Sequence, residues 1–172
     1  LGSAGMTDYI ASLNLTGERA HNWRYCVEAG ELGIPRERSN EAQGVRPGDH
    51  IYIWRSGAAK SGAGLIARVR VSGQATPLDG SERWPRLQTY GCKIPIDQIT
   101  ELSSPVWSRF PNNGRNAQGI ENGWLTRSWA TVPDHVVSGL SSIFEREPVR
   151  SGKVPATDKP DSDALRKFEP KD

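Results

Sequence analysis

The sequence is poor in metal-ligating residues. It has two cysteines, Cys26 and Cys92, and three histidines, His21, His50 and His135, and none of them lies at the spacing of a zinc ligand pair. A zinc site, a histidine–metal nuclease centre or any other cofactor is therefore not expected within the chain. The two cysteines could pair, but reduced, partly buried thiols in a cytoplasmic protein are the simpler expectation.

Long apolar runs and phenylalanine are also scarce. No stretch approaches the ~20 apolar residues of a membrane helix, so a membrane partner is not expected. Three Phe stand against six Trp. Because tryptophan combines a flat face with an N–H donor, this imbalance favours a site in which the indole rings stack on a polar, planar ligand. The net charge of +2 is mildly basic and by itself says little about a nucleic-acid partner.

Composition divides the 172 residues into three parts. Residues 1–5 precede the only methionine, Met6, and resemble a vector remnant. Residues 6–147 are expected to form one domain of ordinary size. Residues 148–172 are rich in Pro, Lys, Asp and Ser, which predicts a linker or disordered tail leading to a further domain that is missing here.

The clearest local pattern is GVRPGDHIYIW, a Pro-Gly-Asp turn followed by a strand that ends at Trp54. A small-residue loop over 55–64 leads to a return strand over 65–73. Further strands are predicted over 8–15 and from Cys92, a helical segment over 22–29, and one amphipathic helix opened by Pro133 and Asp134. Short strands, long loops and a C-terminal helix predict an α+β fold around a twisted, barrel-like sheet of about five to six strands.

Several motifs occur in the order of an EVE domain, which belongs to the PUA-like superfamily and is related to the YTH domain. They are YIASLN, HNWRYCVEAGELGIP, VRPGDHIYIWRSGAAKSGAGLIARV, RWPR and LTRSW followed by VVSGLSSIF, and they span roughly residues 9–145. Members of this family look like readers of modified bases. YTH relatives bind methylated adenine in RNA, and some bacterial EVE domains are fused to HNH-type nucleases.

These fusions resemble the sensing half of modification-dependent (type IV) restriction endonucleases. The resemblance implies a binding module rather than an enzyme. Its partner would be double-stranded DNA that carries 5-methylcytosine or 5-hydroxymethylcytosine, with the modified base flipped into an aromatic pocket. The catalytic domain would follow in a longer protein.

Base reading requires aromatic planes for stacking and fixed polar groups that only the right base edge satisfies. For Trp54, packing in the core is an equally good alternative to base binding. For Asn22, the equally good alternative is a role as the N-cap of a helix. The family often has an aromatic at or beside the position of Leu32, so here either Trp23 or Trp54 takes over that wall or the pocket is open on that side. The candidates for base binding are Asn22, Trp23, Tyr25, Leu32, Trp54, Arg55, Ser56 and Trp84, with Tyr90 as a secondary candidate.

Cations in loops and at helix starts are expected to contact phosphates and so position the duplex. For each of them a solvated surface charge is the alternative. The polar, basic loop over 109–119 is expected to reach into a groove or to wedge the gap left by a flipped base. Trp107, Trp124 and Trp129 are expected to pack with the C-terminal helix. The phosphate candidates are Arg36, Arg38, Lys60, Arg109, Arg115 and Arg127.

Other functions stay open on the sequence alone. An RNA-binding domain that reads a modified ribonucleotide would differ only in its need for the 2′-hydroxyl. A PUA-like domain that binds a small molecule or a protein would use the same aromatic pocket. A hydrolase or nuclease is disfavoured, because Asp49–His50 and Asp134–His135 are neighbours in the chain and no nucleophile, base and orienting group stand out together.

Overall fold

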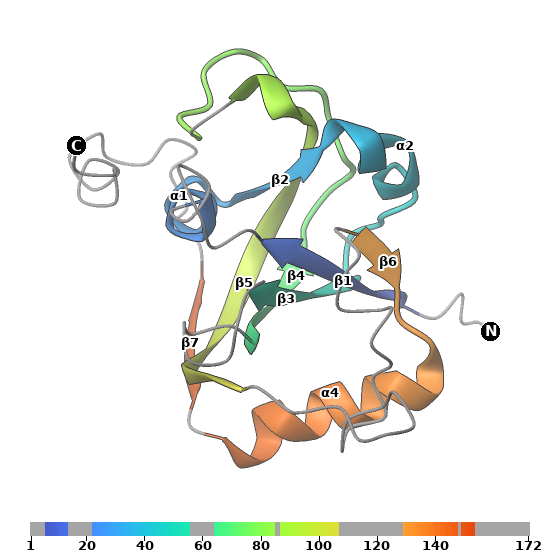
Figure 1. The fold of residues 1–172 in the computed structure, drawn as a ribbon, viewed down its shortest axis with the longest axis vertical. Helices are drawn as coiled ribbons and strands as arrows, with labels where there is room; N and C mark the ends of the chain where they lie inside the picture. Colours follow the sequence, from blue (N-terminus) through green and yellow to red (C-terminus); the bar gives the residue numbers. More distant parts are fainter. Residues whose placement is uncertain are drawn as a thin grey trace.

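The computed structural model describes residues 6–13, 22–55, 64–84, 87–106, 129–147 and 149–153 (Figure 1). The strands are β1 (Asp8–Leu13), β2 (Glu31–Pro35), β3 (His50–Arg55), β4 (Gly64–Val71), β5 (Tyr90–Val106), β6 (Trp129–Thr131) and β7 (Val149–Lys153). The helices are α1 (Asn22–Ala29), α2 (Ser39–Ala42) and α4 (Asp134–Arg146), with 3-10 turns η2 (Arg36–Arg38) and η4 (Leu87–Thr89). Among the described residues, no helix is both long enough and apolar enough to span a bilayer.

The strands form one curled sheet. Six of them follow the order β2-β5-β4-β3-β1-β6, and β7 pairs with β5 outside that path. β1 runs parallel to β3, whereas β5 pairs antiparallel with β2 through its first part and with β4 and β7 through its later part. The predicted α+β fold around a barrel-like sheet of about five to six strands is confirmed, since the described residues form a path of six strands with β7 added beside β5. The three-residue β6 is too short to show a period in the sequence.

Strand β7 lies within the segment that was predicted to be a linker. Its five residues pair with β5 in a continuous antiparallel register, from Leu102 opposite Val149 to Gln98 opposite Lys153. The domain therefore extends at least to residue 153 rather than ending at 147. An antiparallel ladder is made of backbone hydrogen bonds, which polar residues form as well as apolar ones, so composition alone gave no sign of it.

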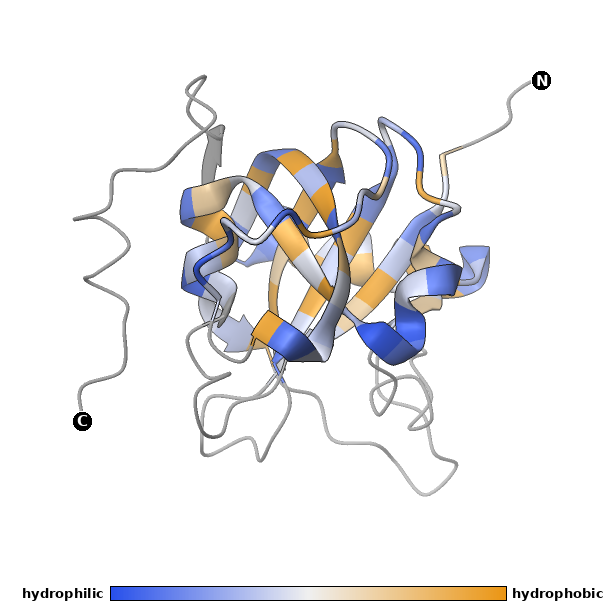
Figure 2. Cartoon of the chain, turned by 90° about the horizontal axis from the view of Figure 1, so that it is seen from above, coloured by the Kyte–Doolittle hydropathy of each residue, from blue (hydrophilic) through white to orange (hydrophobic). Residues whose placement is uncertain are grey.

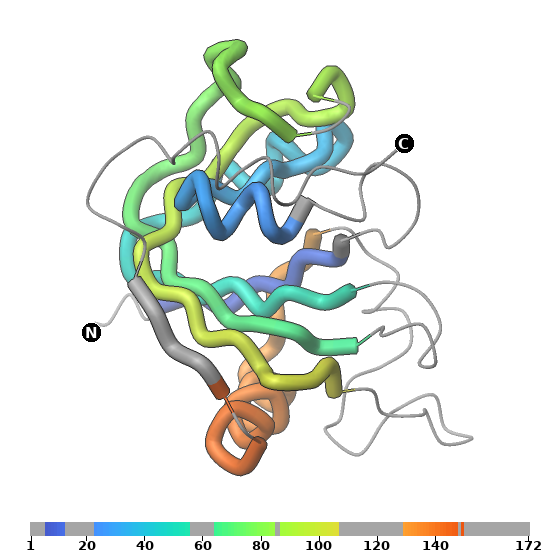
Figure 3. Tube along the Cα trace, turned by 90° about the vertical axis from the view of Figure 1, so that its left-hand side faces the viewer, coloured from blue at the N-terminus to red at the C-terminus, as the bar shows by residue number. Residues whose placement is uncertain are grey.

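The sheet is covered on both faces, and β3 shows why. Side chains alternate across a strand, so Ile51 and Ile53 point to one face while Tyr52 and Trp54 point to the other, and all four are buried. The alternation of apolar and polar residues along the strands is visible in Figure 2. Figure 3 shows α1 on one side of the strands and α4 on the other.

We call the two resulting hydrophobic clusters the α1-side core and the α4-side core. The α1-side core includes Tyr9, Trp23, Tyr25, Cys26, Leu32, Ile34, Ile51, Ile53, Trp84, Tyr90, Cys92 and Trp129. The α4-side core includes Ile10, Tyr52, Trp54, Leu65, Val136, Leu140, Ile143 and Phe144. Both cysteines are free and buried, as the sequence predicted for reduced thiols.

The amphipathic helix is confirmed as α4, with Pro133 at its N-cap position. It is attached to β3 by polar as well as apolar contacts, because the Tyr52 hydroxyl lies 2.9 Å from the Ser141 hydroxyl. Trp129 was predicted to pack with this helix. It stacks instead on Tyr9 in the α1-side core, with the ring centroids 4.8 Å apart.

The turn before β3 is held by Asp49. Its two carboxylate oxygens accept the backbone N–H groups of Thr7 and Arg46, each at 2.9 Å. The neighbouring His50 lies instead near Asp8, with Nδ1 3.9 Å from a carboxylate oxygen. The adjacent Asp49 and His50 therefore do not form a catalytic pair, and the carboxylate has a structural role in the turn.

Candidate functional site

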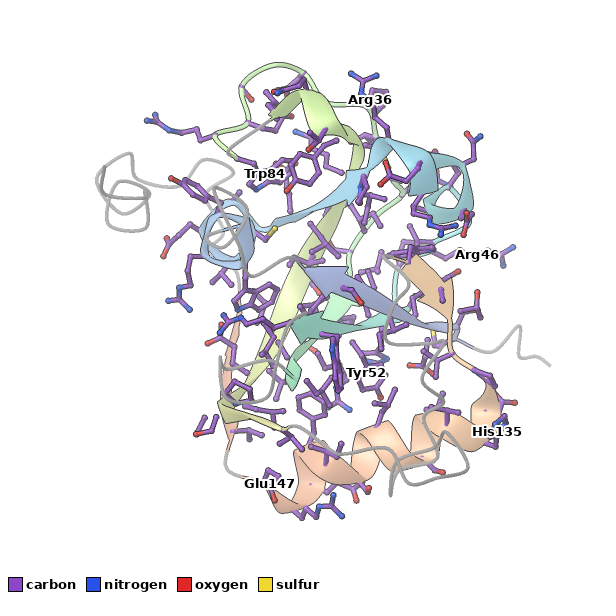
Figure 4. All side chains as sticks on the ribbon, viewed as in Figure 1. Arg36, Arg46, Tyr52, Trp84, His135 and Glu147 are labelled. Atoms are coloured by element: carbon purple, nitrogen blue, oxygen red, sulfur yellow. The ribbon has the colours of Figure 1, made fainter. Side chains whose placement is uncertain are left out.

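Trp84 belongs to the segment between β4 and β5, residues 72–89. It lies on the side of β2 that faces away from β1 and β3 (Figure 4). Gly33 of β2 has no side chain, and a Cβ placed there would lie 3.1 Å from Cζ3 of Trp84 and 3.0 Å from Cδ1 of Tyr90. The two aromatic rings therefore rest directly on the β2 backbone. Their centroids are 5.4 Å apart and the planes are tilted by 51°. Figure 4 shows Trp84 beside β2, at the end of the molecule opposite α4.

A charged cluster lies next to this aromatic pair. Gly33 stands opposite Lys93 in the β2–β5 ladder, so both positions share one face of the sheet. The Lys93 ammonium contacts three carboxylates, those of Glu82 at 2.8 Å, Glu31 at 3.0 Å and Asp79 at 3.5 Å. Glu31 belongs to β2, whereas Asp79 and Glu82 belong to the segment that leads to Trp84.

The cluster is partly shielded from water, which strengthens its interactions. The Lys93 side chain is 11% exposed and that of Glu82 only 2%. Burial alone would lower the pKa of Lys93, but the bonds to Glu82 and Glu31 outweigh it and hold that pKa above its ordinary value. Burial likewise opposes ionisation of Glu82, yet the bond to Lys93 and backbone N–H groups lower its pKa overall. The shifted pKa values keep Lys93, Glu82 and Asp79 charged near neutral pH, and the Glu31 carboxylate lies against the same ammonium group.

A second polar cluster joins α1, β3 and β5. The Trp23 indole N–H donates to Glu101 at 2.9 Å, and Arg24 contacts the same carboxylate oxygen at 3.3 Å. Burial, together with the nearby charge of Arg24, lowers the pKa of Arg55 at the end of β3. The Arg24 and Arg55 guanidinium groups thus lie near the same carboxylate, that of Glu101, at this end of the strands. The first turn of α1 contains no acidic residue.

The predicted base-binding residues do not come together as one cage. Trp84 meets Tyr90, but Trp54 lies on the opposite face of the sheet in the α4-side core. Leu32 alternates with Gly33 along β2, so its side chain points to the face of β2 opposite the one that meets the Trp84 and Tyr90 rings. Trp54 and Leu32 therefore do not face the Trp84 ring, whereas Trp23 and Tyr25 are buried in the same hydrophobic cluster as Trp84.

The remaining predicted base contacts are placed only in part. Arg55 belongs to the second polar cluster. Asn22 opens α1, but its side chain lies outside the described part of the structure, as does Ser56.

Two of the phosphate candidates can be placed. Arg36 is exposed in η2, and its Nε donates to the Gln88 carbonyl at 2.7 Å. Arg38 forms an ion pair with Glu41 at 2.9 Å. Both are surface cations near the Trp84 end of the molecule, and each already has a partner. Lys60, Arg109, Arg115, Arg127, the 109–119 loop, Trp107 and Trp124 lie outside the described residues.

The sequence reasoning missed Lys93 with its three carboxylates, Gly33, and the pair of Arg24 and Glu101. A signal existed for Lys93, since it interrupts the apolar pattern of CKIPI in a predicted strand. Its partners could not be found from spacing, because Glu31 is brought to it by the register of β2 on β5. No three His, Cys, Asp or Glu side chains in the described ranges are grouped so as to hold a metal ion.

Comparison with known proteins identifies the fold. No protein-family model matches the sequence, and no curated protein matches it. The Toxoplasma CPSF4 YTH domain in complex with a 7-mer m6A-modified RNA is 16% identical, with a TM-score of 0.55 over 84% of this chain and 94% of that one. Its apo form is 17% identical, with a TM-score of 0.53 over 86% and 92%.

A second match concerns DNA. Human THYN1, in complex with 5-methylcytosine-containing DNA, is 9% identical, with a TM-score of 0.50 over 83% of this chain and 99% of that one. At such identities the likeness shows a shared fold. The expectation of a PUA-like fold of the EVE and YTH kind is thereby confirmed.

Proposed function

We propose that this chain binds a nucleic acid at a modified base, and that the ring of Trp84 is the surface on which the base stacks. The observation that carries the proposal is the Trp84–Tyr90 pair laid on the bare backbone of Gly33, within a fold shared with domains bound to modified RNA and modified DNA. A base stacked on an aromatic side chain gains about 1–3 kcal/mol.

The modified base we favour is 5-methylcytosine in double-stranded DNA, read by a recognition domain of a modification-dependent endonuclease. Flipping it out of the duplex costs a few kcal/mol, which stacking and edge contacts have to recover. Glu31 lies two residues before Gly33 on the same face of β2, and a carboxylate accepts the exocyclic amino group of cytosine. The methyl group itself adds about 0.8 kcal/mol when buried, so we expect a modest preference.

The two arginines of the second polar cluster support a nucleic-acid partner. Arg24 near the start of α1 and Arg55 at the end of β3 both lie near Glu101, and guanidinium groups form charge-assisted hydrogen bonds to phosphates. Arginine also matches the planar geometry of a phosphate through paired N–H groups. Such contacts position the strand without reading its sequence.

Access to Trp84 requires a movement. The residue is only 4% exposed, and its ring contacts Tyr90 and the backbone of Gly33. A base can stack on it only if Tyr90 or the segment before Trp84 shifts by a few ångströms. We therefore expect binding to change the environment of the indole, which can be followed by its NMR resonance.

A modified RNA is the second candidate. It is favoured by the higher TM-score to a YTH domain bound to m6A-modified RNA than to THYN1. Adenine also carries an exocyclic amino group, so the Glu31 argument does not separate the two bases. The 2′-hydroxyl is the group that would distinguish RNA from DNA.

Competition binding at one moderate salt concentration tests the proposal. The competitors are a duplex with a single 5-methylcytosine, the same duplex unmodified, single-stranded DNA, and RNA with and without m6A. We expect a preference for one modified ligand over its unmodified form, reduced about fivefold or more in Trp84→Leu because the stacking surface is lost. Trp54→Leu is the matched control, since Trp54 is equally buried but lies in the α4-side core, and it should leave the preference unchanged.

Two results would contradict the proposal. Equal binding to each modified and unmodified pair, with affinity falling steeply as salt rises, would mean that only phosphates are contacted. An unchanged preference in Trp84→Leu would place the base elsewhere on the molecule. A preference for m6A RNA over every DNA would select the second candidate.

A further inference from the structure

We infer that Lys93 is a positioning residue that clamps the segment over 76–84 against β2 and β5, and thereby holds Trp84 where the base stacks. The inference rests on the proposed function and deepens it, because it names the group that sets the selectivity of the site without touching the ligand. The clamp consists of Lys93, Glu31, Asp79 and Glu82.

The segment is attached to the sheet at Lys93 in two ways. Thr76 forms an isolated antiparallel bridge with Lys93, in which each backbone N–H donates to the other residue's carbonyl at 2.9 Å. The Lys93 side chain then reaches Asp79 and Glu82 further along the same segment. One residue of β5 therefore fixes both the beginning of the segment and the turn that precedes Trp84.

The turn itself is organised around Glu82. Its carboxylate accepts the backbone N–H groups of Asp79 and Gly80, each at 3.0 Å, while it also binds Lys93. Gly80 has a φ of +90°, a conformation that glycine adopts without strain. Glu82 thus joins the local shape of the turn to the cation in the sheet, two residues before Trp84.

The charges explain why a single cation matters. Glu31 on β2 faces Asp79 and Glu82 on the segment, and these like charges meet at the Lys93 ammonium. Without Lys93, the Glu82 carboxylate, whose side chain is only 2% exposed, would lose the cation 2.8 Å away while two further anions remain beside it. Repulsion and hydration would then both favour moving the segment away from β2.

A displaced segment would take Trp84 with it. The ring is seated against Gly33, which is the residue directly opposite Lys93 in the ladder. The cation and the indole therefore hold the segment on the same face of β2, within one ladder position of each other. Selectivity for the modified base would fall even though no group that touches the base had been changed.

The test compares Lys93→Met with Lys93→Arg and with Arg70→Met as a matched control. Arg70 on the adjacent β4 also forms a close ion pair, with Asp97 at 2.7 Å, but away from the segment. We expect the ratio of affinities for modified over unmodified ligand to fall about fivefold or more in Lys93→Met, the share that stacking contributes. Lys93→Arg should keep most of the ratio, and Arg70→Met all of it.

A double variant separates positioning from a general loss of structure. If Lys93 acts through Trp84, Lys93→Met should not lower the ratio further in a Trp84→Leu background. Should Lys93→Met fail to fold, Asp79→Asn keeps the side-chain oxygen that accepts the Ser81 N–H and hydroxyl and removes a charge that Lys93 binds, and it should lower the ratio in the same direction.

The outcomes that overturn the clamp are distinct from those that overturn the proposed function. A selective wild type with an unchanged ratio in Lys93→Met, or an equal loss in Arg70→Met, would overturn the clamp alone. A wild type that prefers no modified ligand would overturn the proposed function. In that case amide hydrogen exchange at Asp79 and Gly80 decides whether the clamp exists: faster exchange in Lys93→Met than in Arg70→Met supports it, and equal exchange overturns it.

Discussion

At the scale of single residues, the missing side chain of Gly33 determines the geometry of the site. Aromatic rings usually pack against other side chains, but here Trp84 and Tyr90 reach the backbone of a strand. The φ of Gly33 is not positive, so this glycine serves close approach and not an unusual backbone conformation. A methyl group at this position would separate the rings from β2.

Gly33→Ala should therefore shift the aromatic pair. The added Cβ would lie 3.0 Å from the Tyr90 ring and 3.1 Å from the Trp84 ring, so the neighbours have to give way. We expect a loss of about 1–3 kcal/mol in the free energy of unfolding, as for other overpacked sites, together with reduced preference for the modified ligand. Urea denaturation and the competition assay measure the two effects.

Gly44→Ala is the control for that substitution. A Cβ at Gly44 would meet its nearest atom, the Glu41 carbonyl oxygen, only at 3.8 Å, which is ordinary contact. Its stability and ligand preference should match those of the wild type within about 0.5 kcal/mol. Equal effects of the two substitutions would show that Gly33 has no special relation to the aromatic pair.

Individual site residues could be predicted where the residue type is unusual for its local sequence. Trp84 stands in a Pro-flanked, polar connection, where a large aromatic has no obvious packing role, and the structure places it against Tyr90. Trp54 ends the most evident strand, but whether its face of the strand is the one toward α1 or α4 depends on the fold. Lys93 could be noticed as a charge in an apolar strand, yet its three carboxylates come from β2 and from a turn that only tertiary structure brings near.

At the scale of elements, the segment over 76–84 has little regular structure, and charge contributes to its attachment together with the buried ring of Trp84. Its attachment at Lys93 consists of one backbone bridge and the ion pairs to Asp79 and Glu82. Ion pairs respond to pH, whereas the apolar contacts of β3 and α4 do not. Acid or base should therefore release this segment before the sheet unfolds.

The direction of the pH effect follows from the shifted pKa values. The pKa values of Asp79 and Glu82 are lowered in the folded protein, chiefly by Ser81 hydrogen bonds for Asp79 and by Lys93 acting against burial for Glu82. Their contribution to stability is complete above the ordinary values of 3.8 and 4.5, and it is lost as pH falls below them toward the folded pKa values. The pKa of Lys93 is raised, so its contribution is complete below 10.5 and is lost only at higher pH.

We therefore predict that the Trp84 indole N–H resonance keeps its chemical shift between about pH 5 and about pH 10. The limits of this range follow from the ordinary pKa values of the carboxyl groups and of lysine. The resonance should move as the pH falls below about 4. In Lys93→Met the pH-dependent change of this resonance should occur at higher pH, because the carboxylates have lost the cation that lowers their pKa. An acid transition at the same pH in both proteins would show that Lys93 does not stabilise these carboxylates.

Long elements with a clear apolar period were predicted more accurately than short ones without it. The Pro-Gly-Asp turn and the strand after it correspond to β3, and the spacing of apolar residues correctly located α4. The predicted return strand over 65–73 begins one residue later and ends two residues later than β4. Strand β2 has only five residues with a glycine at its centre, and β7 is polar, so neither carries a period that a sequence can show.

At the scale of the whole molecule, the sheet separates the site from much of the core. The α1-side core contains Trp84 and Tyr90, whereas the α4-side core is formed on the opposite face. Substitutions in the α4-side core should therefore change stability more than ligand preference, which is why Trp54→Leu is a suitable control for Trp84→Leu. The long strand β5 links the two regions, since it carries Tyr90 and Lys93 at its beginning and pairs with β7 near its end.

The contribution of β7 can be measured by comparing two truncated chains. One ends at residue 153 and retains β7, and the other ends at residue 147 and lacks it. Without β7, the edge of β5 over 98–102 loses its ladder partner, and unpaired strand edges favour association with other chains. At a net contribution of about 0.5–1.5 kcal/mol for each backbone hydrogen bond, we expect the shorter chain to be less stable by roughly 2–4 kcal/mol. We also expect it to self-associate in analytical ultracentrifugation at concentrations where the longer chain does not.

The affinity ratio for the modified ligand should be the same in both chains while they remain folded, because the Lys93 end of β5 is paired with β2. Equal stability of the two chains would show that β7 contributes nothing to the fold, and a lower ratio in the shorter chain would mean that the two ends of β5 are coupled.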